Sequence, residues 1–215
     1  MMKHTLVAAL VLASLSAPAF AAREAGDFIV RAGWAQVNPN ESSQDVDTGD
    51  YAGNLGEFTV DESNQLGLNF TYMLTDAWAI EVLAASPFKH DVGLAPLGKI
   101  AEVTHLPPTV MAQYYFGSDK LRPYIGAGIN YTYFWDEEFT NDLGGDLTDL
   151  DLSSSWGLAA QVGIDYEINN NWLVNASVWY IDIQTDVKFK LEGAPVKIKT
   201  DIDPWVYMVS VGYKF

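Results

Sequence analysis

The stretch WVYMVSVGYKF, residues Trp205–Phe215, alternates between two kinds of side chain at every step. One of its faces is aromatic or aliphatic throughout: Trp205, Tyr207, Val209, Val211, Tyr213 and Phe215. Successive side chains of a β-strand point to opposite faces, whereas those of a helix repeat roughly every 3.6 residues. Strict alternation over this length therefore predicts a strand with one wholly apolar face.

The same period of two recurs along the chain. It is clear in QLGLNFTY, residues Gln65–Tyr72, and we expect eight strands in all, near residues 27–39, 64–74, 78–92, 101–116, 122–136, 155–168, 172–191 and 196–215. Each run is long enough for the ~9–11 residues with which a tilted strand crosses a bilayer, and their number is even. The sequence therefore predicts an all-β fold, an eight-stranded antiparallel transmembrane β-barrel.

Residues 1–21 have the composition of a leader. Lys3 and His4 give a positive start, residues 6–17 form an apolar core too short to span a bilayer, and Ala19-Phe20-Ala21 is a small-x-small cleavage site. This pattern favours a secretory signal peptide over the alternative, a buried N-terminal helix. We expect a signal peptide at 1–21 and a single barrel domain at 22–215.

Composition narrows the possible functions. The chain has no cysteine, so disulfides and thiolate metal sites are excluded. A net charge of −16 argues against nucleic acid as a partner, because binding nucleic acid needs a basic surface. After the leader there is no apolar run of about 18 residues, although 49% of the chain is hydrophobic. The apolar content is therefore distributed over short strands.

The outer face of the predicted barrel suits lipid better than water. A soluble barrel would alternate in the same way but would need a charged exterior. Here the polar face is mostly Gly, Ala, Ser, Thr, Asn and Gln, and the apolar face carries aromatic residues near strand ends: Trp78, Trp135, Trp156, Tyr166, Trp172, Tyr180, Trp205, Tyr213 and Phe215. Such aromatic girdles mark the edges of a bilayer. We expect contact with outer-membrane lipid and lipopolysaccharide.

The connections and the terminal residue fit this interpretation. The turns at 75–77, 117–121 and 169–171 are short, and most of those at 40–63, 93–100, 137–154 and 192–195 are longer. Outer-membrane barrels have short turns on the inner side and long loops outside. Phe215, in the apolar phase of the last strand, resembles the signal that the barrel-insertion machinery recognises, so we expect that machinery as a partner.

Specific strings along the chain resemble one family. They are Glu24-Ala25-Gly26, Gln65–Met73, Ser86-Pro87-Phe88, His105-Leu106-Pro107-Pro108-Thr109, Arg122-Pro123-Tyr124, Gly126-Ala127-Gly128, Ser155-Trp156-Gly157, Trp172–Tyr180 and Asp203-Pro204-Trp205. The sequence is similar to the OmpW family over essentially all of the mature chain. The resemblance implies a barrel in the outer membrane of a Gram-negative bacterium, with a narrow hydrophobic channel and a link to uptake of small apolar molecules.

Several positions in the inward phase are apolar where a water-filled pore would be polar. Counting in twos from Glu81 places Leu83 inward, and counting from Ser177 places Trp179 inward. We interpret these two as constrictions of a channel that is further lined by Met73, Met111, Phe134, Ile181 and Met208. The alternative is that side chains simply fill so small a barrel. A plugged barrel usually needs paired charges inside, and few are apparent in the sequence.

Pro107-Pro108 interrupts a predicted strand. Proline has no N–H to donate to a β-ladder, so two in succession should leave a gap in the wall. We hypothesise a lateral opening through which an apolar solute leaves into the membrane. The alternative, equally open, is that both prolines lie above the bilayer.

The long loops are acidic, and catalysis is not expected. Glu41, Asp45 and Asp47 lie in the first loop and 136–138 begin the third. A divalent cation bridging to lipopolysaccharide is conceivable, but the EF-hand spacing is missing, so solvated loops are favoured. The mature histidines are His90 and His105, without a nucleophile elbow or a two-His metal spacing. We expect no enzyme, no metal and no cofactor.

These observations predict passive diffusion of small hydrophobic molecules across the outer membrane. The alternative is a sealed structural or surface-interaction barrel that acts through its acidic external loops. A narrow ion-conducting pore is the third possibility.

Overall fold

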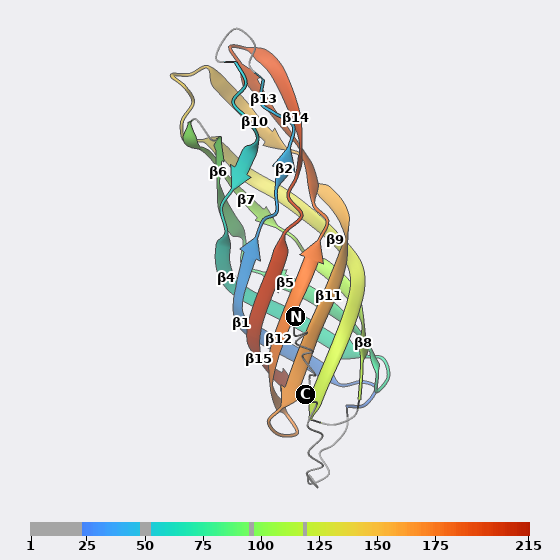
Figure 1. The fold of residues 1–215 in the computed structure, drawn as a ribbon. Helices are drawn as coiled ribbons and strands as arrows, with labels where there is room; N and C mark the ends of the chain where they lie inside the picture. The colour runs from blue at the N-terminus through green and yellow to red at the C-terminus, as the bar shows by residue number, and fades with distance from the viewer. Residues whose placement is uncertain (1–22, 48–52, 95–96, 118–119) are drawn as a thin grey trace, which may run out of the picture.

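The computed structural model describes residues 23–47, 53–94, 97–117 and 120–215, so the expected signal peptide at 1–21 lies outside the described residues. Eight antiparallel strands close into a barrel (Figure 1): β1 (Phe28–Asn38), β4 (Ser63–Met73), β5 (Trp78–Ala85), β8 (Thr109–Tyr115), β9 (Leu121–Phe139), β11 (Ser155–Glu167), β12 (Trp172–Ile181) and β15 (Trp205–Lys214). β15 pairs with β1 and so closes the sheet on itself. The predicted fold class is confirmed. None of the described segments is a helix long and apolar enough to span a membrane.

The register places the apolar phase of every strand outside. Trp34 of β1 lies between Leu66 of β4 and Val209 of β15, and these side chains are 50%, 57% and 61% exposed. One position further along, Ala35 and Met208 are paired and buried. Because side chains alternate between faces, this single register fixes an apolar exterior for all three strands.

Two small sheets extend the barrel at its long-loop end (Figure 1). One contains β3 (Phe58–Val60), β6 (Phe88–Leu94) and β7 (Gly98–Leu106), and β7 pairs with the upper part of β9. The other contains β2 (Ser42–Ser43), β10 (Leu147–Leu152), β13 (Gln184–Leu191) and β14 (Ala194–Asp201). We call these two sheets together the extension.

The extension divides four of the predicted strands. The run 78–92 is β5 and β6, 101–116 belongs to β7 and β8, 172–191 is β12 and β13, and 196–215 is β14 and β15. Prolines lie at the breaks at Pro87, Pro107-Pro108 and Pro204, where no N–H is available for the ladder. The predicted loops 40–63 and 137–154 contain β2, β3 and β10, because Val46, Phe58 and Leu147 are buried there in an apolar cluster.

Three apolar clusters follow one another along the barrel axis. On β12, Leu173 belongs to the cluster at the short-turn end, whereas Trp179 belongs to the middle cluster. Phe139, at the far end of β9, packs against the cluster inside the extension. The polar Asn175 lies between Leu173 and Trp179 and is also buried. The interior is therefore layered, with a polar layer below the middle apolar cluster.

Candidate functional site

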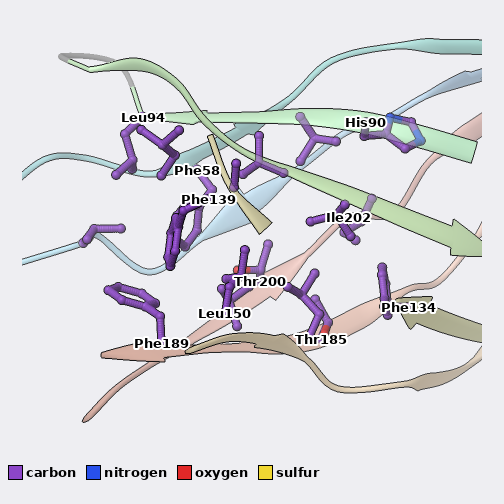
Figure 2. A pocket seen from close by; sticks show the side chains of 18 of the residues that line it. Phe58, His90, Leu94, Phe134, Phe139, Leu150, Thr185, Phe189, Thr200 and Ile202 are labelled. Carbon is purple, nitrogen blue, oxygen red and sulfur yellow. The ribbon is translucent and has the colours of Figure 1, made fainter. Parts of the chain in front are cut away.

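The two sheets of the extension enclose an apolar cavity (Figure 2). The hollow has a volume of about 1020 Å³, including the part that is open to solvent. Aromatic and aliphatic side chains from both sheets line it, among them Phe58, Leu94, Phe139, Leu150 and Phe189. Of the described residues in its wall, the polar ones are His90, His105, Thr185 and Thr200, and none is an acid, lysine or arginine. The cavity is therefore suited to an apolar solute.

A second, narrower hollow of about 370 Å³, again including open space, continues toward the barrel. Val37 lines both hollows. The wall of the second one includes Gly67, Leu83, Ala85, Phe88, Pro107, Ile181 and Met208. This hollow thus reaches the segment where the predicted wall gap lies.

The β-ladder is interrupted beside Pro107. The β5–β8 ladder ends at Leu83 opposite Thr109, and the β6–β7 ladder begins at Phe88 opposite His105. Within the described ladders, no pair joins 84–87 to 106–108, although the Ser86 N–H donates to the Leu66 oxygen of β4 at 3.4 Å. Since Pro87, Pro107 and Pro108 have no N–H, the described wall lacks backbone hydrogen bonds between these two facing segments.

Asn130 of β9 holds the two prolines in place. Its Nδ2 donates to the Pro107 oxygen at 3.1 Å, the Pro108 oxygen at 3.3 Å and the Thr109 hydroxyl at 2.9 Å. The Tyr131 N–H also donates to the Pro108 oxygen, and the Tyr131 ring packs on exposed Trp156. The prolines therefore lie level with the outer row of aromatic residues, at the edge of the lipid-facing band.

A network of buried charges fills the barrel below the apolar hollows. Arg31 contacts Asp165 at 2.6 Å and Glu81 at 3.5 Å, and Arg23 contacts the same Asp165 at 2.6 Å. All four side chains are fully buried. Gln161 donates to Glu81 at 2.9 Å. The expectation that few paired charges occur inside is wrong, and an eight-stranded barrel has little room beside such a network.

The structure gathers most of the predicted channel-lining residues into the middle apolar cluster. That cluster contains Leu83, Met111, Phe134, Trp179, Ile181 and Met208. Trp179 and Met111 are fully buried, and each lies along its strand between the hollow and the charged network. They form the floor of the apolar region. Met73 lies in the cluster at the short-turn end, on the far side of the network. Pro107 lines the narrower hollow, and Pro108 is exposed.

Sequence reasoning missed the charged network and the pairing of the two histidines. Asp165 and Glu81 stand in the inward phase of their strands, and this signal was available by counting in twos. His90 and His105 come together because β6 pairs with β7, and their ring centroids are 5.0 Å apart. That contact depends on a hairpin register that the residue types alone do not specify.

A closed antiparallel barrel with an aromatic-bordered apolar exterior and a buried network of polar and charged side chains inside defines a small outer-membrane β-barrel protein. The OmpW family model matches residues 24–215, and the chain belongs to this family. It is thus a protein of the outer membrane of Gram-negative bacteria.

Individual relatives agree with this assignment. The chain is 53% identical over 218 residues to outer membrane protein W of Escherichia coli (strain K12), with 100% of both chains covered. It is 25% identical over 219 residues to the dibenzothiophene metabolism operon protein PahQ of Pseudomonas aeruginosa, again with 100% of both covered. The crystal structure of the outer membrane protein OprG from Pseudomonas aeruginosa matches with a TM-score of 0.83 and 43% identity, covering 89% of this chain and 97% of that one.

Proposed function

We propose that the protein admits small hydrophobic molecules passively from outside and releases them sideways into the outer membrane. The observation that carries the proposal is the spatial order of the layers inside the molecule. An apolar cavity lies at the loop end, a gap in the wall lies beside it, and a buried network of charges lies below. A solute in the cavity therefore has an apolar route through the wall and none along the axis.

Energetics favour the lateral route. Each buried CH₂ group of a solute contributes about 0.8 kcal/mol on leaving water, so the cavity attracts alkyl chains. Passage along the axis would separate Arg31 from Asp165, and breaking a buried ion pair costs about 3–5 kcal/mol. Exit between residues 84–87 and Pro107 breaks no ladder hydrogen bond, because none joins these two segments within the described chain.

Two further points favour a hydrophobic solute over the alternative function. The name of one relative, PahQ, links that protein to the metabolism of dibenzothiophene, an apolar aromatic compound. The runner-up, a surface-interaction barrel acting through acidic loops, has weaker support, because Asp149 and Asp151 are engaged by Lys190 and Lys188. Lipopolysaccharide outside, and the insertion machinery at Phe215, remain expected partners.

Uptake by whole cells tests the proposal. Initial rates of decane entry are compared in cells that lack the gene and in cells that express the wild type, Pro107→Val with Pro108→Thr, or Pro123→Val. Pro123 also lies in a barrel strand but pairs at the short-turn end, so it serves as the matched control. We expect faster entry with the wild type and the control, and slower entry with the double variant, at equal amounts of folded barrel. Equal rates in all strains would remove the proposal.

A further inference from the structure

Two histidines supply most of the polarity of the otherwise apolar cavity. His90 of β6 and His105 of β7 are 5% and 6% exposed, and both line the cavity. Their rings stack with an interplanar angle of 28°, and the rings of Phe88 and Phe134 both pack against His105. Figure 2 shows His90 and Phe134 at one end of the cavity and Phe139 and Phe189 at the other. The cavity therefore has a polar end and an apolar end.

A hydrogen bond fixes the tautomer of His90. Its Nδ1 lies 2.6 Å from the backbone oxygen of Asp61. A carbonyl oxygen only accepts, so Nδ1 carries the proton and donates. Burial lowers the pKa of His90, which lies in the extension beyond the lipid-facing band, so the ring is neutral at pH 7. In a neutral imidazole the other nitrogen, Nε2, is then a lone-pair acceptor.

This acceptor has no donor within the described chain. His90 Nε2, His105 Nδ1 and the hydroxyl of Thr200 are buried without a hydrogen-bond partner among the described residues. The stacked arrangement prevents the two rings from satisfying each other, because ring nitrogens form hydrogen bonds in the plane of the ring. A buried polar atom left unpaired costs about 1–3 kcal/mol, and native structures rarely leave three around one cavity.

We propose that the cavity selects hydrophobic molecules that carry a hydroxyl group, such as primary alkanols. The hydroxyl donates its hydrogen to His90 Nε2, and the alkyl chain lies among Phe58, Phe139 and Phe189. The inference rests on the proposed function and names its substrate class. An alkane leaves the acceptor unpaired, and an ether, ester or carboxylate offers only acceptors to an atom that needs a donor. At His90 Nε2 the selectivity is therefore for a ligand that donates a hydrogen bond.

Two isomers separate these possibilities. 1-Decanol and 1-methoxynonane have the same formula, but only the alcohol donates a hydrogen bond. Their dissociation constants are measured with the full protein in phosphatidylcholine vesicles, and protein-free vesicles give the background partition. We expect the wild type to prefer the alcohol about tenfold more than His90→Phe does. Comparing the same two ligands between proteins cancels their different partition into lipid.

A matched variant separates loss of the acceptor from a change in cavity shape. Phe58→Leu alters the same cavity without removing a polar atom, so it should weaken both isomers equally and keep the preference. In wild-type protein with ¹⁵N-labelled histidine, 1-decanol should move the Nε2 resonance of His90 and 1-methoxynonane should not. This readout needs no variant and holds even where His90→Phe fails to fold.

The results distinguish the inference from the proposed function. Equal affinity of the wild type for the two isomers, with an unmoved Nε2 resonance, overturns the alcohol class. Decane uptake that still depends on the protein would then leave the proposed function standing. Absence of binding by either isomer also overturns the inference, and decane uptake that is equal with and without the protein removes the proposed function as well.

Discussion

Asp165 neutralises two arginines at once. Arg31 and Arg23 both contact its Oδ2 at 2.6 Å, inside the barrel and away from water. Asp165→Asn keeps the shape but leaves two buried cations facing an amide, so we expect a loss of about 3–5 kcal/mol in the free energy of unfolding. Asp151→Asn is the control, because its pair with Lys188 is exposed and should contribute about 0–1 kcal/mol. Urea unfolding in lipid vesicles measures the free energy of unfolding of both variants. Equal losses in the two would contradict the role of Asp165 as the shared partner of the two buried arginines.

His105 makes stability depend on pH. Burial, and secondarily the charge of His90, lowers its pKa from 6.5 to about 3. Because the unfolded state then binds the extra proton first, stability is complete above about pH 6.5 and falls as the pH drops below it. At pH 5 the loss attributable to His105 is about 2 kcal/mol.

His105→Phe should remove that slope while keeping the ring contacts with Phe88 and Phe134. Unfolding free energies of wild type and variant at pH 7.5, 6 and 5 provide the measurement. Parallel curves for the two proteins would show that His105 titrates normally in the folded state.

At the scale of the elements, specific hydrogen bonds hold the segment Pro107-Pro108, where the wall is interrupted. Asn130 donates to both proline oxygens, and the neighbouring Tyr131 N–H donates to Pro108. Asn130→Ala removes the clamp but leaves each proline oxygen one donor, the Thr109 hydroxyl and the Tyr131 N–H, so we expect a loss of about 0.5–1.5 kcal/mol. It should also speed hydrogen exchange at the Tyr131 amide. The exchange rate at the Ile125 amide, in the same strand but far from the gap, is the internal reference. If the ratio of the Tyr131 rate to the Ile125 rate is the same in the variant as in the wild type, the role of Asn130 is contradicted.

The sequence predicted the barrel strands well because lipid imposes a strict pattern on them. Every outward position between the girdles must be apolar, so Trp34, Leu66 and Val209 reveal their register directly. The extension follows weaker rules. Its strands pack against one another, and β2, β3 and β10 are short, so their alternation is lost among acidic loop residues. The same limit explains why Pro107 was recognised as a break while the cavity beside it was not predicted.

At the scale of the whole molecule, the interior is open at one end and filled at the other. The apolar cavity and the middle cluster lie on the loop side, and the Arg31–Asp165 network lies on the short-turn side. The sealed barrel and the hydrophobic conduit were alternatives at the level of sequence. The layered structure has features of both, an apolar cavity at the loop end and a lumen that the charged network fills below it.

This arrangement predicts that apolar solutes and ions behave differently toward the same protein. In a planar bilayer the wild type should carry no steady ion current, because the charged network occupies the lumen. Trp179→Ala should also carry none, because it removes the apolar floor and leaves the network intact below it. Arg31→Ala with Asp165→Ala removes the centre of the network and leaves Arg23 with Glu167, so ion current should appear. Steady current through the wild type would instead favour the ion-pore alternative, and a silent double variant would show that other side chains close the barrel.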